Sequence, residues 1–502
     1  MSIIQEVTRE NFERILPTVF TFIDNADFVS VDTELTGLHA GKTCRYSHFD
    51  DLPTRYKKLR ESSQQFAVVQ LGISCFKRNP KNSRWSSHSY SFSVAPMGLT
   101  NDSNAGSELK FTCQASAISF LAMNGFDFNK SFCKGIGYIS RSEETRLREG
   151  LGGGERKDKY PTIEIVKEQD VKFIAGIYEL VEEWLPNEQV ASIELPQSNS
   201  YQRLLIHQQC QIKYPGTFLE KNHVKGKVAL SIHRGSREEP SRQQVFLDQL
   251  EGQIGLRKVW DRVINGKKTV VVHNGFLDLC HLMHKFEGPL AAEFNDFKSK
   301  VCALLPNVFD TKYLCLMAEE IRELSGNSLG ELVEFLKDAG ECVNSPTEGI
   351  QLHDAGYDAF CTGKVFVAFI LKYHSPVSQD NILQSVDGLA NRLNIMQSPY
   401  AYANLAGSDP EPDWSKILVL SKIPVEWQNR DVHGFIAKND WKCSYSRNNE
   451  ESYFLSFETT EDSARALAFN FVDLGYSLMP IDQFRAGAVT EQVPLKRSRS
   501  NE

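Results

Sequence analysis

An apolar run, Phe28-Val29-Ser30-Val31, leads directly into Asp32-Thr33-Glu34, and this stretch decides the fold. The run predicts a strand, and side chains two apart on a strand project from the same face, so Asp32 and Glu34 would lie side by side. Burying two carboxylates together is costly unless a cation neutralises them, which makes the pair a candidate metal site. Taken alone, the pair fits better with a strand end that runs into solvent, because residues 33–37 have the composition of a turn.

A third acid follows another apolar run. Residues 269–273 predict a strand, and Asp278 falls in the first turn of the helix predicted after it. Ligands of open α/β sheets bind at this edge. On its own, Asp278 is better explained as an acid favoured by the helix dipole. His281 and His284 share the helix, but their apolar neighbours indicate core and surface positions rather than a metal site.

The last motif is a histidine five residues before an acid. His353 precedes a helix predicted over residues 357–373, and Asp358 stands in its first turn. The motifs together supply four carboxylates and a histidine, the set that two-metal hydrolysis of a phosphodiester requires. The histidine can accept the proton of an attacking water because its pKa lies near neutrality.

The composition is that of a soluble protein with several domains. At about 150 residues per domain, the 502 residues predict roughly three domains, and 41% hydrophobic residues supply large cores. A net charge of −8 excludes binding of nucleic acid by general basic charge, so such contacts must come from local patches or bound metal. No apolar run approaches the about 18 residues of a membrane span. Eleven scattered cysteines and the lack of a signal peptide indicate an intracellular, reducing location.

These patterns predict an α/β chain in which one domain is inserted into another. Residues 48–63 are expected to be a charged connection, and the glycines at 150–154 are expected to lie in a flexible linker over residues 140–159. The predicted divisions are a nuclease domain in two parts (1–150 and 246–375), an inserted module (155–245), a linker (376–412), a C-terminal α+β domain (413–486) and a disordered tail (487–502).

The motifs resemble the DEDD superfamily of 3′–5′ exonucleases, in the subgroup whose third motif supplies histidine; a tyrosine-type member would carry Tyr at position 354, which here is Asp. More closely, the chain resembles the poly(A)-specific ribonuclease family. The matching stretches are residues 28–38, 120–130, 309–312 and 355–359, and the likeness covers residues 1–373.

The resemblance implies an RNase H-like core in which Asp32, Glu34, Asp278 and Asp358 ligate two Mg²⁺ ions, with Mn²⁺ as a substitute, and His353 is the general base. Asp310 is given a supporting role, because its strand position can point away from the metals. The activity that the resemblance implies is hydrolysis of single-stranded RNA from the 3′-hydroxyl, with a preference for adenosine and release of 5′-nucleotides. A homodimer is also implied.

Two accessory modules are expected to bind RNA. In this family the nuclease is interrupted by a small single-strand-binding module with an Arg-x-x-x-His motif, which Arg203 and His207 match. The C-terminal domain resembles a degenerate RNA-recognition motif that keeps only Phe454 of the stacking aromatics. Trp427 and Trp441 are candidate substitutes, and contacts with a dimer partner or another protein are an equal alternative for this domain.

The sequence leaves two classes of RNA substrate open. The main interpretation is deadenylation. The alternative is trimming of small non-coding RNA precursors such as pre-piRNAs, and a trimming enzyme would need a small-RNA carrier protein. A catalytically silent RNA-binding scaffold is a second alternative, although all five catalytic positions are filled. We expect a cytoplasmic protein, with a nuclear pool left open by the basic patch at residues 496–499.

Overall fold

The computed structural model describes residues 4–95, 110–152, 165–187, 189–224, 227–235, 242–324, 327–339, 353–374, 382–469 and 475–490. The chain forms two compact units, one made of Met1–Glu143 with Gln253–Glu502 and the other of Glu144–Gly252. Most of the tail predicted to be disordered lies outside the described residues. No helix in the described part of the chain is long and apolar enough to cross a membrane.

The larger unit is built on an eight-stranded mixed sheet with the order β1-β4-β3-β2-β8-β9-β10-β11. Its strands are β1 (Gln5–Val7), β2 (Phe28–Leu35), β3 (Val68–Arg78), β4 (Trp85–Ser93), β8 (Thr269–Val272), β9 (Val308–Asp310), β10 (Arg392–Leu393) and β11 (Ala403–Asn404). The central strand β2 is antiparallel to β3 and parallel to β8, which in turn is parallel to β9. The C-terminal ends of β2, β8 and β9 therefore meet at one edge, where α/β sheets bind ligands.

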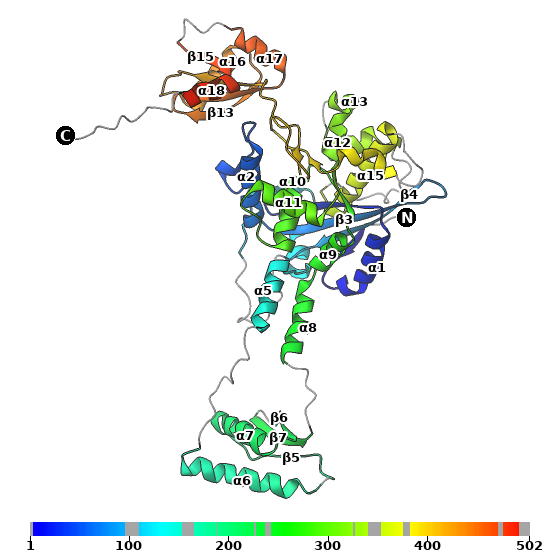
Figure 1. The fold of residues 1–502 in the computed structure, drawn as a ribbon, viewed down its shortest axis with the longest axis vertical. Helices are drawn as coiled ribbons and strands as arrows, with labels where there is room; N and C mark the ends of the chain where they lie inside the picture. Colours follow the sequence, from blue (N-terminus) through cyan, green and yellow to red (C-terminus); the bar gives the residue numbers. More distant parts are fainter. Residues whose placement is uncertain are drawn as a thin grey trace, which may run out of the picture. The chain divides into compact units, whose positions relative to one another are not determined.

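Successive side chains of β2 point to opposite faces of the sheet, so they contribute to two separate layers of the hydrophobic core. Val29 and Val31 face the first layer, whereas Phe28 faces the second, where it contacts Phe366. The helices of the first layer are α1 (Phe12–Asn25), α2 (Leu52–Gln65), α9 (Arg257–Asn265), α10 (Phe276–Leu282) and α11 (Phe294–Leu304). Those of the second are α12 (Thr311–Met317), α13 (Glu319–Arg322), α14 (Leu329–Phe335), α15 (Ala355–Tyr373) and η4 (Ile382–Leu389). Figure 1 shows α1 and α15 on opposite sides of the sheet.

Short elements complete this part of the unit. They are η1 (Lys42–Cys44), α3 (Ala115–Met123), α4 (Phe128–Lys134) and the π-helical turn η2 (Met283–Glu287). Two longer helices, α5 (Arg141–Gly152) and α8 (Arg242–Ile254), cross the boundary between the two units.

Three predictions about connecting segments are wrong. The charged connection at 48–63 contains α2, whose buried stripe was hidden because it includes Arg55, Ser62 and Ser63 among its apolar residues. The linker predicted at 140–159 is helical up to Gly152, and residues 153–159 lie outside the described residues. The linker predicted at 376–412 contributes η4, β10 and β11 and so extends the central sheet, because β10 pairs with β9.

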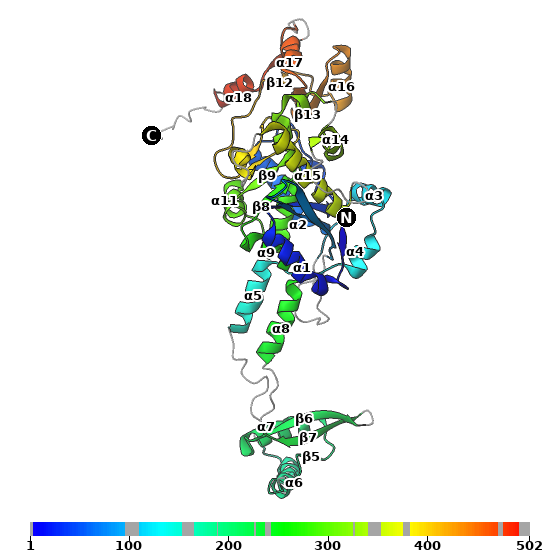
Figure 2. The same cartoon turned by 90° about the vertical axis from the view of Figure 1, so that its right-hand side faces the viewer.

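The inserted unit has its own small core. It contains α6 (Glu168–Trp184), β5 (Ser192–Glu194), α7 (Ser200–Lys213), β6 (Thr217–Val224) and β7 (Lys227–Arg234). The three strands form a sheet with the order β5-β7-β6, and Figure 2 shows these strands beside α6 and α7. Apolar side chains of α6, α7 and β7 pack against one another. An amphipathic helix pair on a short sheet is enough to bury one continuous apolar face.

The C-terminal domain is a four-stranded antiparallel sheet with the order β13-β14-β12-β15. Its elements in chain order are β12 (Ile417–Ser421), α16 (Asn429–Lys438), β13 (Cys443–Asn449), β14 (Ser452–Phe457), α17 (Thr460–Leu467), β15 (Ser477–Pro480) and α18 (Ile481–Thr490). One face of the sheet packs against α16 and α17. On the other face, Val419 and Phe454 pack with Ile481 and Phe484 of α18 and with Phe49, which precedes α2.

Candidate active site

Strand β2 presents its two acids to the N-terminal end of α15. Residues with even numbers on β2 share one face, and the hydroxyl of Ser30 on that face donates a hydrogen bond of 2.6 Å to the carbonyl oxygen of Ala359 in α15. Asp32 and Glu34 follow on the same face. The strand-end alternative for these acids is thus replaced by a packed arrangement against α15.

A glycine on the neighbouring strand allows this close approach. Gly72 pairs with Asp32 across the sheet, and a Cβ at this position would lie 1.7 Å from the carbonyl oxygen of Ala355. Only a residue without a side chain lets the first turn of α15 come this near to β3. Sequence reasoning missed Gly72, although a glycine inside a strand is a signal of close backbone approach.

Asp358 is held beside His353 by a main-chain contact. The N–H of His353 donates to Oδ2 of Asp358 at 2.9 Å, and His353 adopts a left-handed backbone with φ of 75°. The other carboxylate oxygen, Oδ1 of Asp358, is buried and has no hydrogen-bond partner among the described residues. An orphaned carboxylate oxygen in a buried site is suited to a cation.

The His353 ring is half-buried. It makes an edge contact with Phe120 of α3, with ring centroids 4.6 Å apart. Burial lowers the pKa of His353 below its ordinary value. The imidazole is therefore neutral at pH 7 and can accept a proton.

Asp278 reaches the site from the first turn of α10. The hydroxyl of Thr33, which alternates with Asp32 and Glu34 along β2 and so points to the opposite face, donates a hydrogen bond to Oδ1 of Asp278. This contact orients the carboxylate toward the strand. Sequence reasoning did not identify Thr33, because its partner is 245 residues away.

Burial raises the pKa values of all four acids, and repulsion between the acids adds to the shift at Asp32 and Glu34. Burial, with Asp278 and Asp358 adding to it, raises the pKa of Asp32 well above its ordinary value, and burial together with Asp358 does the same for Glu34. Burial raises the pKa of Asp278 to about 6 and that of Asp358 to about 7. A divalent cation would remove this penalty.

Three side chains of the site have the spacing of a metal-binding group. Ligand atoms of Glu34, His353 and Asp358 all lie within 4.8 Å of one another. Carboxylate oxygens are the ligands that Mg²⁺ prefers. Glu34, His353 and Asp358 therefore fit a site for a divalent cation.

Two further acids near the site have structural roles. Asp310 is fully buried and accepts hydrogen bonds from the main-chain N–H groups of Asn274, Gly275, Lys312 and Asn394, so it fastens the turn before α10, as its supporting role anticipated. Asp354 caps α15 by accepting from the N–H of Tyr357, and its other oxygen accepts from the side chains of Gln70 and Ser91.

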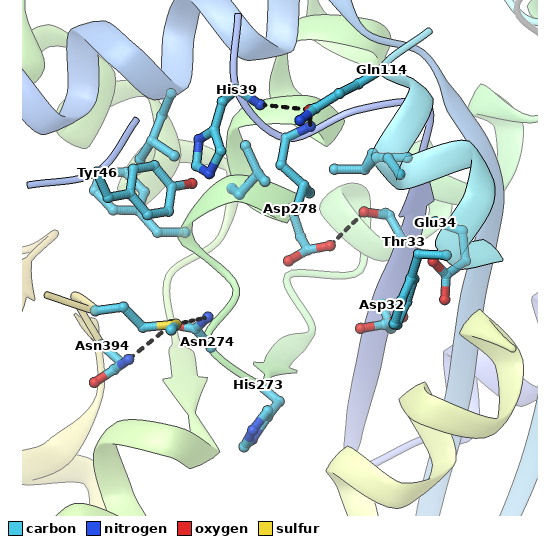
Figure 3. A pocket seen from close by; sticks show the side chains of 18 of the residues that line it. Asp32, Thr33, Glu34, His39, Tyr46, Gln114, His273, Asn274, Asp278 and Asn394 are labelled. Atoms are coloured by element: carbon cyan, nitrogen blue, oxygen red, sulfur yellow. Dashed lines mark hydrogen bonds between the residues drawn. The ribbon is translucent and has the colours of Figure 1, made fainter. Parts of the chain in front are cut away.

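The acids open into a pocket of about 900 Å³. Its lining includes all five residues assigned to catalysis, along with Tyr46, Phe120, Asn274 and Met396. Figure 3 shows Asp32, Thr33, Glu34 and Asp278 on one side of the pocket and Tyr46, Asn274 and Asn394 on the other. One side of the pocket is charged, and the other side offers apolar and amide groups. Such a pocket suits a substrate that combines phosphates with bases.

Comparisons with known proteins agree with this chemistry. Residues 7–366 match the model of the CAF1 family ribonuclease. Curated relatives include the poly(A)-specific ribonuclease PARN of Bos taurus, 31% identical over 85% of this chain and 72% of its own length, and that of Danio rerio, 32% identical over 91% and 74%. The chain belongs to the CAF1 ribonuclease family. A pre-piRNA 3′-exonuclease trimmer of Bombyx mori is 26% identical over 81% of this chain and 80% of its own length.

Family membership confirms the prediction of an exoribonuclease of the poly(A)-specific type that the motifs supported. A solved structure, that of S. pombe Pop2p with bound Mg²⁺ and Mn²⁺, covers 74% of this CAF1-family chain and 94% of its own, at 15% identity and a TM-score of 0.37.

The accessory residues of this ribonuclease are engaged within the chain. On α7, the guanidinium of Arg203 donates to the carbonyl oxygen of Ser198 and to the hydroxyl of Ser200, so it ties down the start of its own helix. His207 is half-buried, and burial lowers its pKa. The ring of Phe454 lies 4.9 Å from that of Phe49, so in this structure it is not presented to an RNA base as the sequence predicted.

Proposed function

We propose that the protein is a divalent-metal-dependent 3′–5′ exoribonuclease that removes nucleotides from adenosine tails. The observation that carries the proposal is the meeting of four carboxylates and His353 in one pocket of a chain whose relatives include poly(A)-specific ribonucleases. The charge of the site supports it, because the clustered carboxylates and the scissile phosphate are all negative and a bound cation would offset their repulsion.

The geometry of the pocket and the family resemblance support the following catalytic roles. Asp32, Glu34, Asp278 and Asp358 would hold two Mg²⁺ ions, for which Mn²⁺ is a substitute. When bound there, the ions supply the charge that activates a water and stabilises the leaving oxygen. Thr33 fixes the carboxylate of Asp278 by its hydrogen bond. Neutral His353 takes the proton of the attacking water, because its lowered pKa keeps it unprotonated at pH 7.

The test is degradation of 5′-labelled, A-tailed RNA in Mg²⁺, comparing the wild type with Asp32→Ala and using a 3′-blocked RNA as control. A ladder that shortens from the 3′ end, absent with the variant and with the blocked RNA, supports the proposal. Clean wild-type protein that leaves the RNA intact, or a variant that digests it equally, would favour the RNA-binding scaffold instead.

Trimming of small-RNA precursors is the second candidate, because the Bombyx mori trimmer aligns over four-fifths of both chains. Digestion of A, U and C homopolymers separates the two. Strong preference for A supports deadenylation, and equal rates support trimming, which would need a carrier protein to present the RNA. A homodimer stays a proposal that rests on the family resemblance, and a cytoplasmic location stays one that rests on the scattered cysteines.

A further inference from the structure

Arg55 is a buried cation that lines the active-site pocket but does not belong to the set of catalytic groups. Its side chain, on α2, is only 3% exposed. The guanidinium Nε donates to Oδ2 of Asp50 at 3.0 Å, Nη1 donates to the carbonyl oxygen of Met396 at 2.6 Å, and Nη2 donates to those of Ser47 and Gln397 at 3.0 and 2.8 Å. One planar group thus joins two segments that are about 350 residues apart in the sequence.

Both segments are walls of the active-site pocket. The first wall, residues 45–50, contributes Arg45 and Tyr46 to the pocket, and the Arg55 guanidinium lies 4.5 Å from the centre of the Tyr46 ring. The second wall, residues 394–397, lies beyond the 7–366 span of the family match, yet all four of its residues line the pocket.

The second wall is also tied to the catalytic side of the sheet. The side-chain amide of Asn394 donates to Asn274 at 2.8 Å, and that of Asn274 donates to the sulfur of Met396 at 3.0 Å, as Figure 3 shows for this corner of the pocket. The N–H of Asn394 donates to Asp310 at 3.0 Å. The wall is therefore held at one end by the turn before Asp278 and at the other by Arg55.

We propose that Arg55 is a positioning residue that holds these two walls together, and that the walls bind the RNA nucleotides next to the scissile phosphate. The proposal rests on the proposed nuclease function and deepens it. The walls carry suitable chemistry: the Tyr46 ring and the half-exposed thioether of Met396 offer apolar surface to a base, and Arg45 offers a cation to a phosphate. A buried ion pair contributes little net stability, so a role in geometry explains the Arg55–Asp50 pair better than a role in stability.

The test compares Arg55→Lys and Arg55→Met with Lys298→Met as a matched control. Lys298 is also a buried cation. Its ammonium group donates hydrogen bonds to Gly407 and Asp409, which follow the second wall in the sequence but do not line the pocket. Each Arg55 variant should raise KM for A-tailed RNA about tenfold and leave kcat within about twofold, because the walls contact the RNA equally in the ground and transition states. The control should leave KM within about twofold of wild type.

A second readout does not depend on activity. Amide hydrogen exchange should rise at residues 45–50 and 394–397 together in Arg55→Lys and stay at the wild-type level there in Lys298→Met. The affinity for A-tailed RNA in Ca²⁺ should fall about tenfold in Arg55→Lys, in parallel with KM. If Arg55→Met does not fold, Arg55→Lys, which keeps the charge, carries the comparison.

The proposal is overturned if the folded Arg55 variants bind RNA as wild type does, or if Lys298→Met shows the same change in KM and exchange. Failure of the proposed function looks different. In that case the wild type leaves RNA intact, while the exchange and Ca²⁺ binding measurements still report on the walls.

Discussion

His353 and Asp358 are joined by a hydrogen bond of 2.9 Å from the main-chain N–H of the first to the carboxylate of the second. The contact is made possible by the left-handed backbone of His353, with φ of 75°. It places the proposed base and a proposed metal ligand in one rigid turn at the start of α15.

The backbone of His353 allows its side chain to be tested without unfolding the turn. His353→Asn should lower kcat about 10²–10⁴-fold, because it removes the proton acceptor. Asparagine tolerates positive φ better than most residues, so the melting temperature should stay near that of wild type. Steady-state kinetics and thermal unfolding check this. A variant that retains more than half of wild-type kcat would exclude His353 as the base.

The metal-free protein should lose stability as the pH rises. Asp278 and Asp358 have folded-state pKa values of about 6 and about 7, above the ordinary value of 3.8, so between these limits the folded state binds more protons than the unfolded state. Stability then falls as the pH rises from about 4 to about 7, and the loss is complete above both pKa values.

In EDTA, we expect the melting temperature to drop by roughly 5 °C or more between pH 5 and pH 8. Saturating Mg²⁺ should remove most of this drop, since it binds the ionised acids. Asp32→Asn should reduce the drop in EDTA, because it deletes one of the repelling charges. Calorimetry of the wild type and of Asp32→Asn, with Mg²⁺ and with EDTA, measures these melting temperatures. A melting temperature that rises with pH in EDTA would contradict the proposed repulsion between the buried acids.

Gly72 should tolerate no side chain. In Gly72→Ala the new methyl group would meet the Ala355 carbonyl oxygen, so the start of α15 must shift. We expect a loss of roughly 1–3 kcal/mol in the free energy of unfolding and a fall in kcat of about 10²-fold, because the shift displaces Asp358 and His353. Gly434→Ala on α16, where nothing lies within 4 Å, is the matched control and should leave kcat unchanged. Equal kinetics for both variants would disprove this role of Gly72.

Phe454 should contribute to stability rather than to RNA binding. Its ring packs against Phe49 and the α18 side of the sheet, so Phe454→Ala should cost roughly 1–3 kcal/mol of unfolding free energy. The affinity for A-tailed RNA should stay within about twofold, since the ring is not free to stack on a base. Denaturant titration and fluorescence anisotropy measure the two quantities. A tenfold loss of affinity at unchanged stability would restore the stacking role that the sequence predicted.

Local patterns indicated the acids as candidates, although each motif taken alone fitted a structural role as well or better. The two-residue spacing of Asp32 and Glu34 on an apolar strand, the position of Asp278 after a second strand and the spacing from His353 to Asp358 are each readable because strand and helix periodicity is a local property. Together with the family-like stretches, they identified the kind of enzyme before any contact was known.

Tertiary structure alone decided how these residues meet and what surrounds them. Gly72 brings α15 onto β3, Thr33 orients Asp278, and Arg55 joins the two walls, all through contacts between residues far apart in the sequence. α2 escaped prediction because its buried face contains Arg55 and two serines, and residues 376–412 escaped it because very short strands have no period to detect. The residue types along the chain fix which chemistry the protein can perform. The shape of the pocket depends on long-range packing, because buried polar groups must find partners that no local pattern reveals.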